Sequence, residues 1–129
     1  MMRSDIEMRM DISIRQSVVR SGLFVEARET PCETDELRKA EETGKIFSIL
    51  PYEVVLYPKF AFSQGRLVDE LAEVIAILAS GGRSPWLMAA WFVSVNGYLG
   101  GQSPAEMLQL APLQVLAAAR REVAGIQHG

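Results

Sequence analysis

Two well-marked helix starts in the last third of the chain constrain its fold more than any other sequence feature. Ser84-Pro85 and Ser103-Pro104 each place a hydroxyl at the N-cap and a proline at the first helical position, where an N–H would have no helical partner anyway. Glu106 follows Ser103 at the three-residue spacing of a capping box. The region therefore predicts a compact set of helices, suited to a protein-interaction module.

A turn is predicted between these helices. Asn96-Gly97 and Gly100-Gly101 flank Tyr98-Leu99, and asparagine and glycine tolerate the positive φ angles that tight turns require. A final helix is expected to begin at Pro112. The apolar face of that helix consists of Val115, Leu116, Ala119 and Val123.

Two further helices precede the turn. Residues 66–80 show the apolar spacing of one helical face, with a stop at Ser80-Gly81-Gly82. Residues 85–95 are apolar on nearly all sides, so this helix is either buried between neighbours or presents a face to a partner. A composition shift near Gly65 suggests a boundary between an N-terminal segment, residues 1–64, and a helical domain, residues 65–129.

The N-terminal segment gives less regular signals. Apolar and polar residues alternate over positions 6–14, as in a half-buried strand, but a helix over about 12–21 that ends at Gly22 is favoured. Whether residues 5–15 form a strand or a helix stays open. Residues 24–29 suggest a short helix, and Thr34 is expected to cap a polar helix over 35–43, which Gly44 closes.

A β-hairpin is predicted after that polar helix. Residues 45–49 and 54–57 are rich in β-branched and aromatic side chains, and Pro58 would end the second strand or keep it at an edge. The expected fold is therefore mainly α with a small β-hairpin: a degenerate winged helix-turn-helix followed by a compact C-terminal helical domain.

The sequence offers little material for catalysis. The only histidine, His128, is second from the C-terminus, and the only cysteine, Cys32, has no neighbouring histidine. One Cys and one His do not make a typical zinc site, and the glycines follow an apolar helix instead of forming a phosphate-binding loop after a strand. We expect no enzyme activity, no catalytic residue, no metal and no cofactor.

Charge and hydropathy restrict the expected binding partners and cellular location of the protein. The formal net charge of −3 argues against a strongly basic nucleic-acid binder. No apolar run approaches the roughly 20 residues of a membrane span, and the N-terminus lacks the pattern of a signal peptide. A cytoplasmic protein without membrane association is expected.

The order and spacing of residues in the last third of the chain resemble a known family, the toxin-binding domain of Xre/MbcA/ParS-type antitoxins. These antitoxins pair with RES-domain toxins in bacterial type II toxin-antitoxin modules. The matching positions are Trp91 to Ser94, Asn96, Leu99, Gly101, Ser103-Pro104, Leu108 and Val115 to Arg120. Residues 33–62, ending in Tyr57-Pro58-Lys59-Phe60-Ala61-Phe62, are similar to the family's helix-turn-helix, wing and following phrase.

The resemblance implies an antitoxin that binds and sterically inhibits a RES-type, NAD-consuming toxin. The turn at 99–104 and the last helix would contact the toxin, and the C-terminal tail would approach its NAD site. The residues expected at or beneath this contact are Trp91, Leu99, Gly101, Pro104, Val123, Gln127, His128 and Gly129. A homo-oligomer is also expected.

Two alternatives stay open. The protein could be a DNA-binding transcriptional autoregulator that uses residues 12–62 on promoter DNA, with phosphate contacts from Arg38, Lys39, Lys45 and Lys59. Acidic neighbours in residues 33–42 would oppose this role by repelling phosphates. The chain could also be an orphan helical interaction module with a different protein partner.

Overall fold

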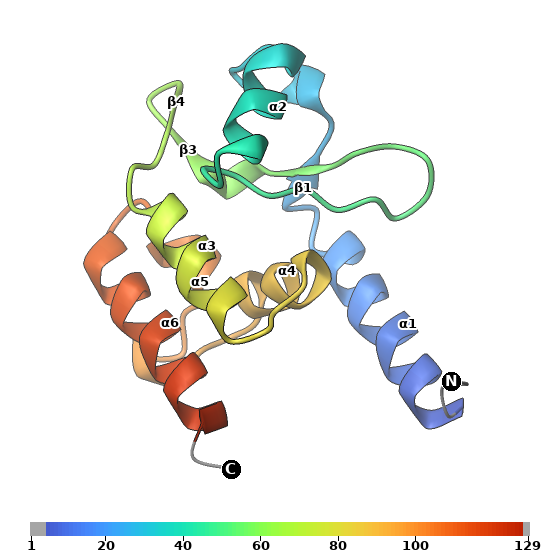
Figure 1. Ribbon diagram of the computed structural model, residues 1–129, viewed down its shortest axis with the longest axis vertical. Helices are drawn as coiled ribbons and strands as arrows, with labels where there is room; N and C mark the ends of the chain where they lie inside the picture. Colours follow the sequence, from blue (N-terminus) through green and yellow to red (C-terminus); the bar gives the residue numbers. More distant parts are fainter. Residues whose placement is uncertain (1–4, 128–129) are drawn as a thin grey trace.

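The protein is mainly helical, with a small antiparallel β-hairpin, as the sequence predicts (Figure 1). The computed structural model describes the backbone of residues 5–127 and their side chains, apart from those of residues 5, 7, 126 and 127. The α-helices are α1 (Asp5–Arg20), α2 (Thr34–Glu42), α3 (Leu71–Ser80), α4 (Pro85–Val93), α5 (Pro104–Met107) and α6 (Pro112–Gln127). The strands are β1 (Phe24–Val25), β2 (Tyr57–Pro58), β3 (Phe62–Ser63) and β4 (Arg66–Leu67), and the 3-10 turns are η1 (Ala27–Glu29), η2 (Lys59–Ala61) and η3 (Gly97–Leu99).

Both capped helix starts are confirmed. The Ser84 hydroxyl accepts a hydrogen bond from the Leu87 amide at 3.4 Å, and Pro85 is the first residue of α4. At α5 the Ser103 hydroxyl accepts from the Glu106 amide at 3.2 Å, and the Glu106 carboxylate accepts from the Ser103 amide at 3.5 Å. This reciprocal capping box satisfies amides that the helix itself leaves without partners.

Helices α3 and α6 pack side by side at one edge of the molecule (Figure 1). The predicted face of α6 is buried, as are Leu71, Val74 and Leu78 of α3. Where α3 ends, Gly81 lies so close to Val123 that a Cβ built on the glycine would stand 2.8 Å from the valine Cγ2. The glycine therefore permits the close approach of the two segments.

An aromatic cluster joins the first half of the chain to α4. Phe92 is fully buried, and its ring centroid lies 4.9 Å from that of Phe60 and 5.9 Å from that of Phe47. Phe24 of β1 meets the Phe60 ring edge-on at 5.7 Å. Buried residues on both sides of position 65 form one hydrophobic core, while the division into two domains at that position stays a prediction.

The alternating segment at the N-terminus is a helix, which decides the question left open by the sequence. α1 runs from Asp5 to Arg20, so it begins about two turns earlier than predicted. A half-buried strand needs a neighbour to pair with and a core on one face, and neither is present at this end of the described chain. Of the described α1 side chains, only Val18 is fully buried.

The strands lie at other places than predicted. The short helix predicted over residues 24–29 is limited to the 3-10 helix η1, and the preceding residues form β1. β1 pairs with β2 through Phe24 opposite Pro58 and Val25 opposite Tyr57. The predicted hairpin of 45–49 with 54–57 is reduced to one bridge, Ile49 to Leu56. Tyr57, the residue after Leu56, pairs with Val25 of β1 and not with the 45–49 segment, so the local hairpin is limited to one residue pair.

The observed hairpin joins β3 and β4 through a two-residue turn. Gln64 and Gly65 adopt φ angles of 53° and 77°, which suit such tight hairpins. This placement makes Leu67 a strand residue, so α3 begins at Leu71 and not at the start of the apolar pattern. The helix of residues 34–42 is confirmed within a residue, with Glu33 at the N-cap in place of Thr34.

Candidate functional site

The partner-binding residues predicted from the sequence lie largely under the surface. Trp91, Leu99 and Val123 are 6–8% exposed, and Pro104 is fully buried. Such residues shape a surface from below instead of contacting a partner directly. Gln127 is the last residue of α6, and His128 and Gly129 lie outside the described residues.

The turn between α4 and α5 is held by its own backbone. The Asn96 side chain accepts a hydrogen bond from the Tyr98 amide at 2.9 Å, and the Asn96 carbonyl accepts from the Gly101 amide at 3.0 Å. Gly100 and Gly101 adopt φ angles of 68° and 85°, a region that favours glycine. Leu99 points into the core while Tyr98 is half exposed, so the turn presents its tyrosine in a fixed position.

Tyr98 belongs to a shallow hollow between the turn and α6. The hollow has a volume of about 500 Å³ and is lined by Asn96, Gly97, Tyr98, Ala118, Arg121 and Glu122. The Arg121 guanidinium lies 4.8 Å from the centre of the Tyr98 ring, a cation–π contact. We call these residues, with the exposed Val95, the turn–α6 surface.

The sequence identified the turn and the helix of this surface but not the pair that faces outward. Tyr98 and Arg121 are 23 positions apart, and nothing in local spacing indicates that they meet. The sequence feature that pointed to an outward-facing residue was the pair of glycines after Tyr98-Leu99. In such a tight turn, one residue of the Tyr98-Leu99 pair faces inward and the other faces outward. Leu99 is the inward one.

The predicted DNA-contacting residues are exposed, but they do not stand apart from acidic groups. Arg38 and Lys39 lie on α2, and Lys45 and Lys59 lie on separate segments. Glu41 of the same helix accepts a hydrogen bond from the Ser48 hydroxyl at 2.8 Å.

Glu41 also acts on Tyr57. The pKa of Tyr57 is raised above 10.0, first by burial and then by the negative charge of Glu41, against a lowering effect of Arg38. The Glu41 carboxylate and the Arg38 guanidinium, both on α2, therefore act on the same tyrosine. The side of α2 that carries Arg38 is not purely basic. DNA binding by α2 stays a prediction.

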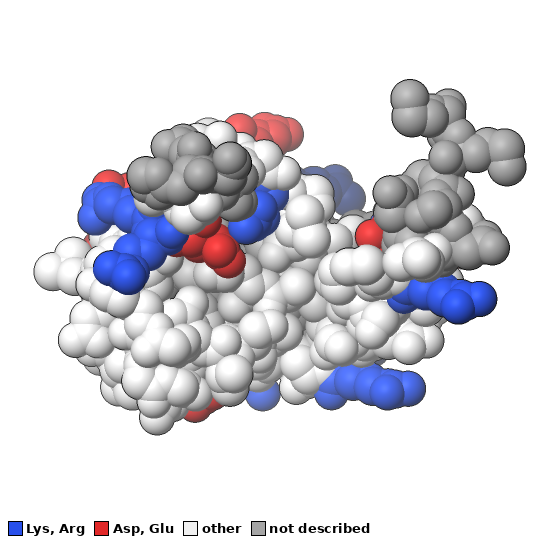
Figure 2. Space-filling view, turned by 90° about the horizontal axis from the view of Figure 1, so that it is seen from below, with Lys and Arg blue, Asp and Glu red and all other residues white. Residues whose placement is uncertain are grey.

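Seen from below, blue and red residues lie together at the left of the molecule, two blue groups and one small red area lie at the right, and a broad uncharged area lies between them (Figure 2). A continuous basic surface, the usual electrostatic signature of nucleic-acid binding, is not present on this face among the described residues.

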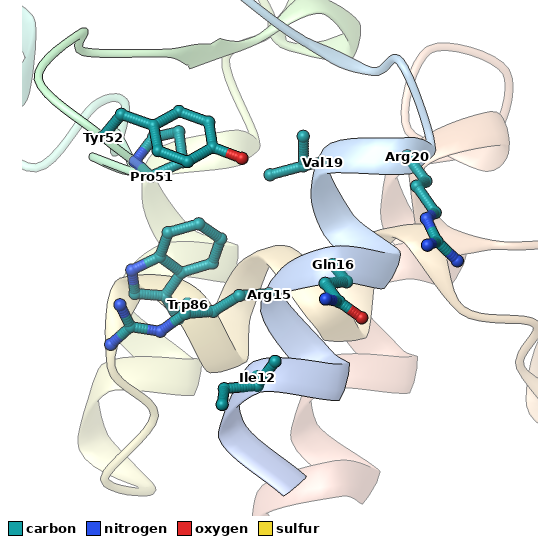
Figure 3. Close-up of a pocket in the computed structure, with 8 residues that line it drawn as sticks. All are labelled: Ile12, Arg15, Gln16, Val19, Arg20, Pro51, Tyr52 and Trp86. Atoms are coloured by element: carbon teal, nitrogen blue, oxygen red, sulfur yellow. The ribbon is translucent and has the colours of Figure 1, made fainter. Parts of the chain in front are cut away.

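A second concave region lies beside α1. It is a groove of about 460 Å³ between α1, the 51–52 loop and α4 (Figure 3). Arg15 extends over the Trp86 ring, with its guanidinium carbon 4.9 Å from the ring centre. The groove is lined by Ile12, Arg15, Gln16, Val19, Arg20, Pro51, Tyr52 and Trp86.

The side chains that could bind a metal ion or act as nucleophiles are dispersed over the described part of the chain. No three His, Cys, Asp or Glu side chains within it gather in a way that could hold a metal ion. Cys32 is partly buried, and its pKa is raised by that burial and by the negative charge of Glu36. A raised pKa leaves less of the reactive thiolate at neutral pH, which suits a structural thiol better than a nucleophile.

Comparison with known proteins found no related sequence or structure. No family model matches the chain, and no curated protein or solved structure is significantly similar to it. Within residues 5–127, none of the helices combines the length and the apolar character required to traverse a bilayer.

Proposed function

We propose that the protein is a non-enzymatic antitoxin of a type II toxin-antitoxin module, which binds a RES-domain toxin in the cytoplasm and blocks its access to NAD. The motif resemblance in residues 91–120 suggests this partner. The observation that carries the proposal is the turn–α6 surface: a backbone-fixed turn presents Tyr98 and Arg121 beside the last helix. Aromatic and arginine side chains are the residue types enriched at binding hot spots.

The inhibition would be steric. Trp91, Leu99, Pro104 and Val123 form the buried support, and Gly101 allows the backbone conformation of the turn. Tyr98 and Arg121 would contact the rim of the toxin cleft. α6 would direct Gln127, His128 and Gly129 toward the substrate pocket. A support already ordered before binding reduces the entropy lost on association.

Co-expression with the product of the adjacent reading frame tests the proposal. That product alone should arrest growth and deplete cellular NAD, and the intact chain should restore both. The double variant Tyr98→Ala/Arg121→Ala should lose neutralisation and co-purification while keeping its thermal unfolding transition. Tyr52→Ala is the matched control, since Tyr52 is 80% exposed but lies away from the turn–α6 surface.

The tail is tested separately by deleting residues 125–129. This truncation should preserve binding but weaken neutralisation, because the tail is proposed to act at the substrate pocket. A non-toxic neighbour, or full neutralisation by both the double variant and the truncation, would show that the proposed mechanism is wrong.

A further inference from the structure

Two adjacent arginines of α6 lie in different electrostatic surroundings. The Arg120 guanidinium lies 2.9 Å from the Glu73 carboxylate of α3, the helix that packs beside α6 (Figure 1). Arg121 has no salt bridge to any carboxylate that the structure describes, and its guanidinium lies over the Tyr98 ring instead. Arg121 therefore carries a positive charge that the described chain does not pair.

Glu122, the acidic residue that lines the hollow of the turn–α6 surface, already has a partner. Its carboxylate lies 3.5 Å from the Arg83 guanidinium, and this salt bridge is partly shielded from water, with the two side chains 36% and 23% exposed. Among the residues described around the hollow, the cation at Arg121 thus lacks a salt bridge while the carboxylate has one. The electrostatic complement of the hollow is a single negative charge.

Tyr98 holds the Arg121 guanidinium at the hollow. A guanidinium that lies over an aromatic ring keeps the N–H donors at its edge available, and these donors match the two oxygens of a carboxylate. The tyrosine is itself fixed by the turn, because its amide donates to the Asn96 side chain at 2.9 Å. Tyr98 is therefore a positioning residue for Arg121.

The rest of the hollow suits an incoming acidic side chain. Asn96 uses its carboxamide oxygen for the Tyr98 amide, so its NH2 group is left to donate to an acceptor that enters the hollow. Val95, which is 79% exposed beside the turn, offers an apolar edge. A phosphate group would bring close to two negative charges, for which the hollow has no second unpaired cation, so a carboxylate is the better match.

We infer that Arg121 binds an aspartate or glutamate carboxylate of the partner protein through two parallel hydrogen bonds, and that this pair determines the specificity of the turn–α6 surface. The inference rests on the proposed function, because it takes the partner to be the protein that binds this surface. In the free chain, water screens the charge of Arg121. When the partner covers the hollow, the lower local dielectric strengthens a matched pair, and an uncharged or basic residue at the same place leaves Arg121 without a counter-charge.

The first test compares the two arginines in binding to the product of the adjacent reading frame, by isothermal titration calorimetry. Arg121→Gln should weaken binding by about tenfold or more, because it leaves the partner carboxylate unpaired in the interface. Arg121→Lys should also weaken binding, since an ammonium group lacks the planar fork of a guanidinium. Arg120→Gln is the matched control and should bind like the parent chain, because Arg120 is the next residue along the same helix and is paired with Glu73. All three variants should keep the thermal unfolding transition of the parent.

Charge exchange identifies the partner carboxylate. Arg121→Glu should abolish binding, and a partner variant in which one aspartate or glutamate is changed to arginine should restore it, since opposite charges then meet again. Tyr98→Leu should weaken binding and Tyr98→Phe should not, because the ring and not the hydroxyl positions the guanidinium.

A titration without the partner separates this inference from the proposed function. Sodium propionate, which carries the carboxylate of a glutamate side chain, should shift the Nε–H NMR signal of Arg121 in the parent chain and leave that of Arg120 unchanged, at constant ionic strength. If the neighbouring product does not bind the parent chain, the proposed function fails and this titration alone decides the inference. Parent-like binding by Arg121→Gln, equal losses for Arg121→Gln and Arg120→Gln, the absence of a restoring partner variant, or a propionate shift no larger at Arg121 than at Arg120 would overturn it.

Discussion

The two ends of the molecule differ in how many of their apolar residues they bury. The segment from α4 to α6 encloses many of them: Phe92, Leu108 and Val115 are fully buried, and Trp91 and Leu99 nearly so, whereas Val95, Leu110 and Leu113 stay exposed. α1 leaves most of its apolar residues in solvent, and only Val18 is buried among its described side chains. The described part of α1 therefore adds one fully buried side chain to the hydrophobic core, whereas the C-terminal segment supplies many.

This difference predicts unequal costs for truncating side chains. Phe92→Ala should lower the free energy of unfolding by about 3–5 kcal/mol, because it opens a cavity inside the aromatic cluster. Ile12→Ala, measured at a concentration where the chain is monomeric, should change it by about 0.5 kcal/mol or less. Urea denaturation of both variants measures the contrast, and equal losses would contradict it.

Gly81→Ala should destabilise the C-terminal segment by about 1–3 kcal/mol, because the added methyl would collide with the stiff side chain of Val123. Adding Val123→Ala should recover part of this loss, so the two changes should not be additive. Gly97→Ala is the control, since no atom lies within 4 Å of its added Cβ. Thermal unfolding of the four variants measures the coupling, and strict additivity would exclude the contact.

The two helix caps should differ in strength. Ser103→Ala should cost about 1–2 kcal/mol, because the serine is buried and takes part in the reciprocal capping box. Ser84→Ala should cost about 0.5 kcal/mol, because its hydrogen bond is long and exposed. Denaturant midpoints at constant slope give the comparison, and a larger loss at Ser84 would reverse the ranking.

The raised pKa of Tyr57 predicts that the free energy of unfolding decreases above pH 10. Its folded-state pKa is raised above 10.0 by burial and by Glu41, so its contribution to stability is complete below pH 10. That contribution is lost as pH rises through the raised value. Tyr57→Phe should therefore flatten the decline in unfolding free energy above pH 10, at a cost of about 1 kcal/mol at neutral pH. An unchanged alkaline slope would assign the decline to other groups.

Local signals account for the parts of the fold that the sequence predicted well. Capping residues, terminal glycines and the apolar face of α6 act within a few positions of each other, so α4, α5 and α6 begin where the sequence predicts. The site was only partly predictable for the same reason. The turn was visible in its glycines, but the outward pair Tyr98 and Arg121 depends on how α6 packs against that turn.

Strand pairing was decided by the tertiary structure. Residues 45–57 contain the composition of a hairpin, yet β2 pairs with β1, which lies more than thirty positions earlier in the chain. The alternation at positions 6–14 likewise suits a strand, but without a neighbouring edge the backbone satisfies its hydrogen bonds within a helix.

The sequence by itself determined the starts of α4, α5 and α6, the turn at residues 96–101 and the mainly helical class, because capping and turn geometry depend on adjacent residues. Only the tertiary structure decided which apolar residues are enclosed and which remain exposed. The aromatic cluster and the exposed side chains Met8 and Ile12 of α1 are both apolar, and they differ in the packing partners that the fold brings to each. Burial requires groups distant in the sequence to meet, and local composition does not specify those meetings.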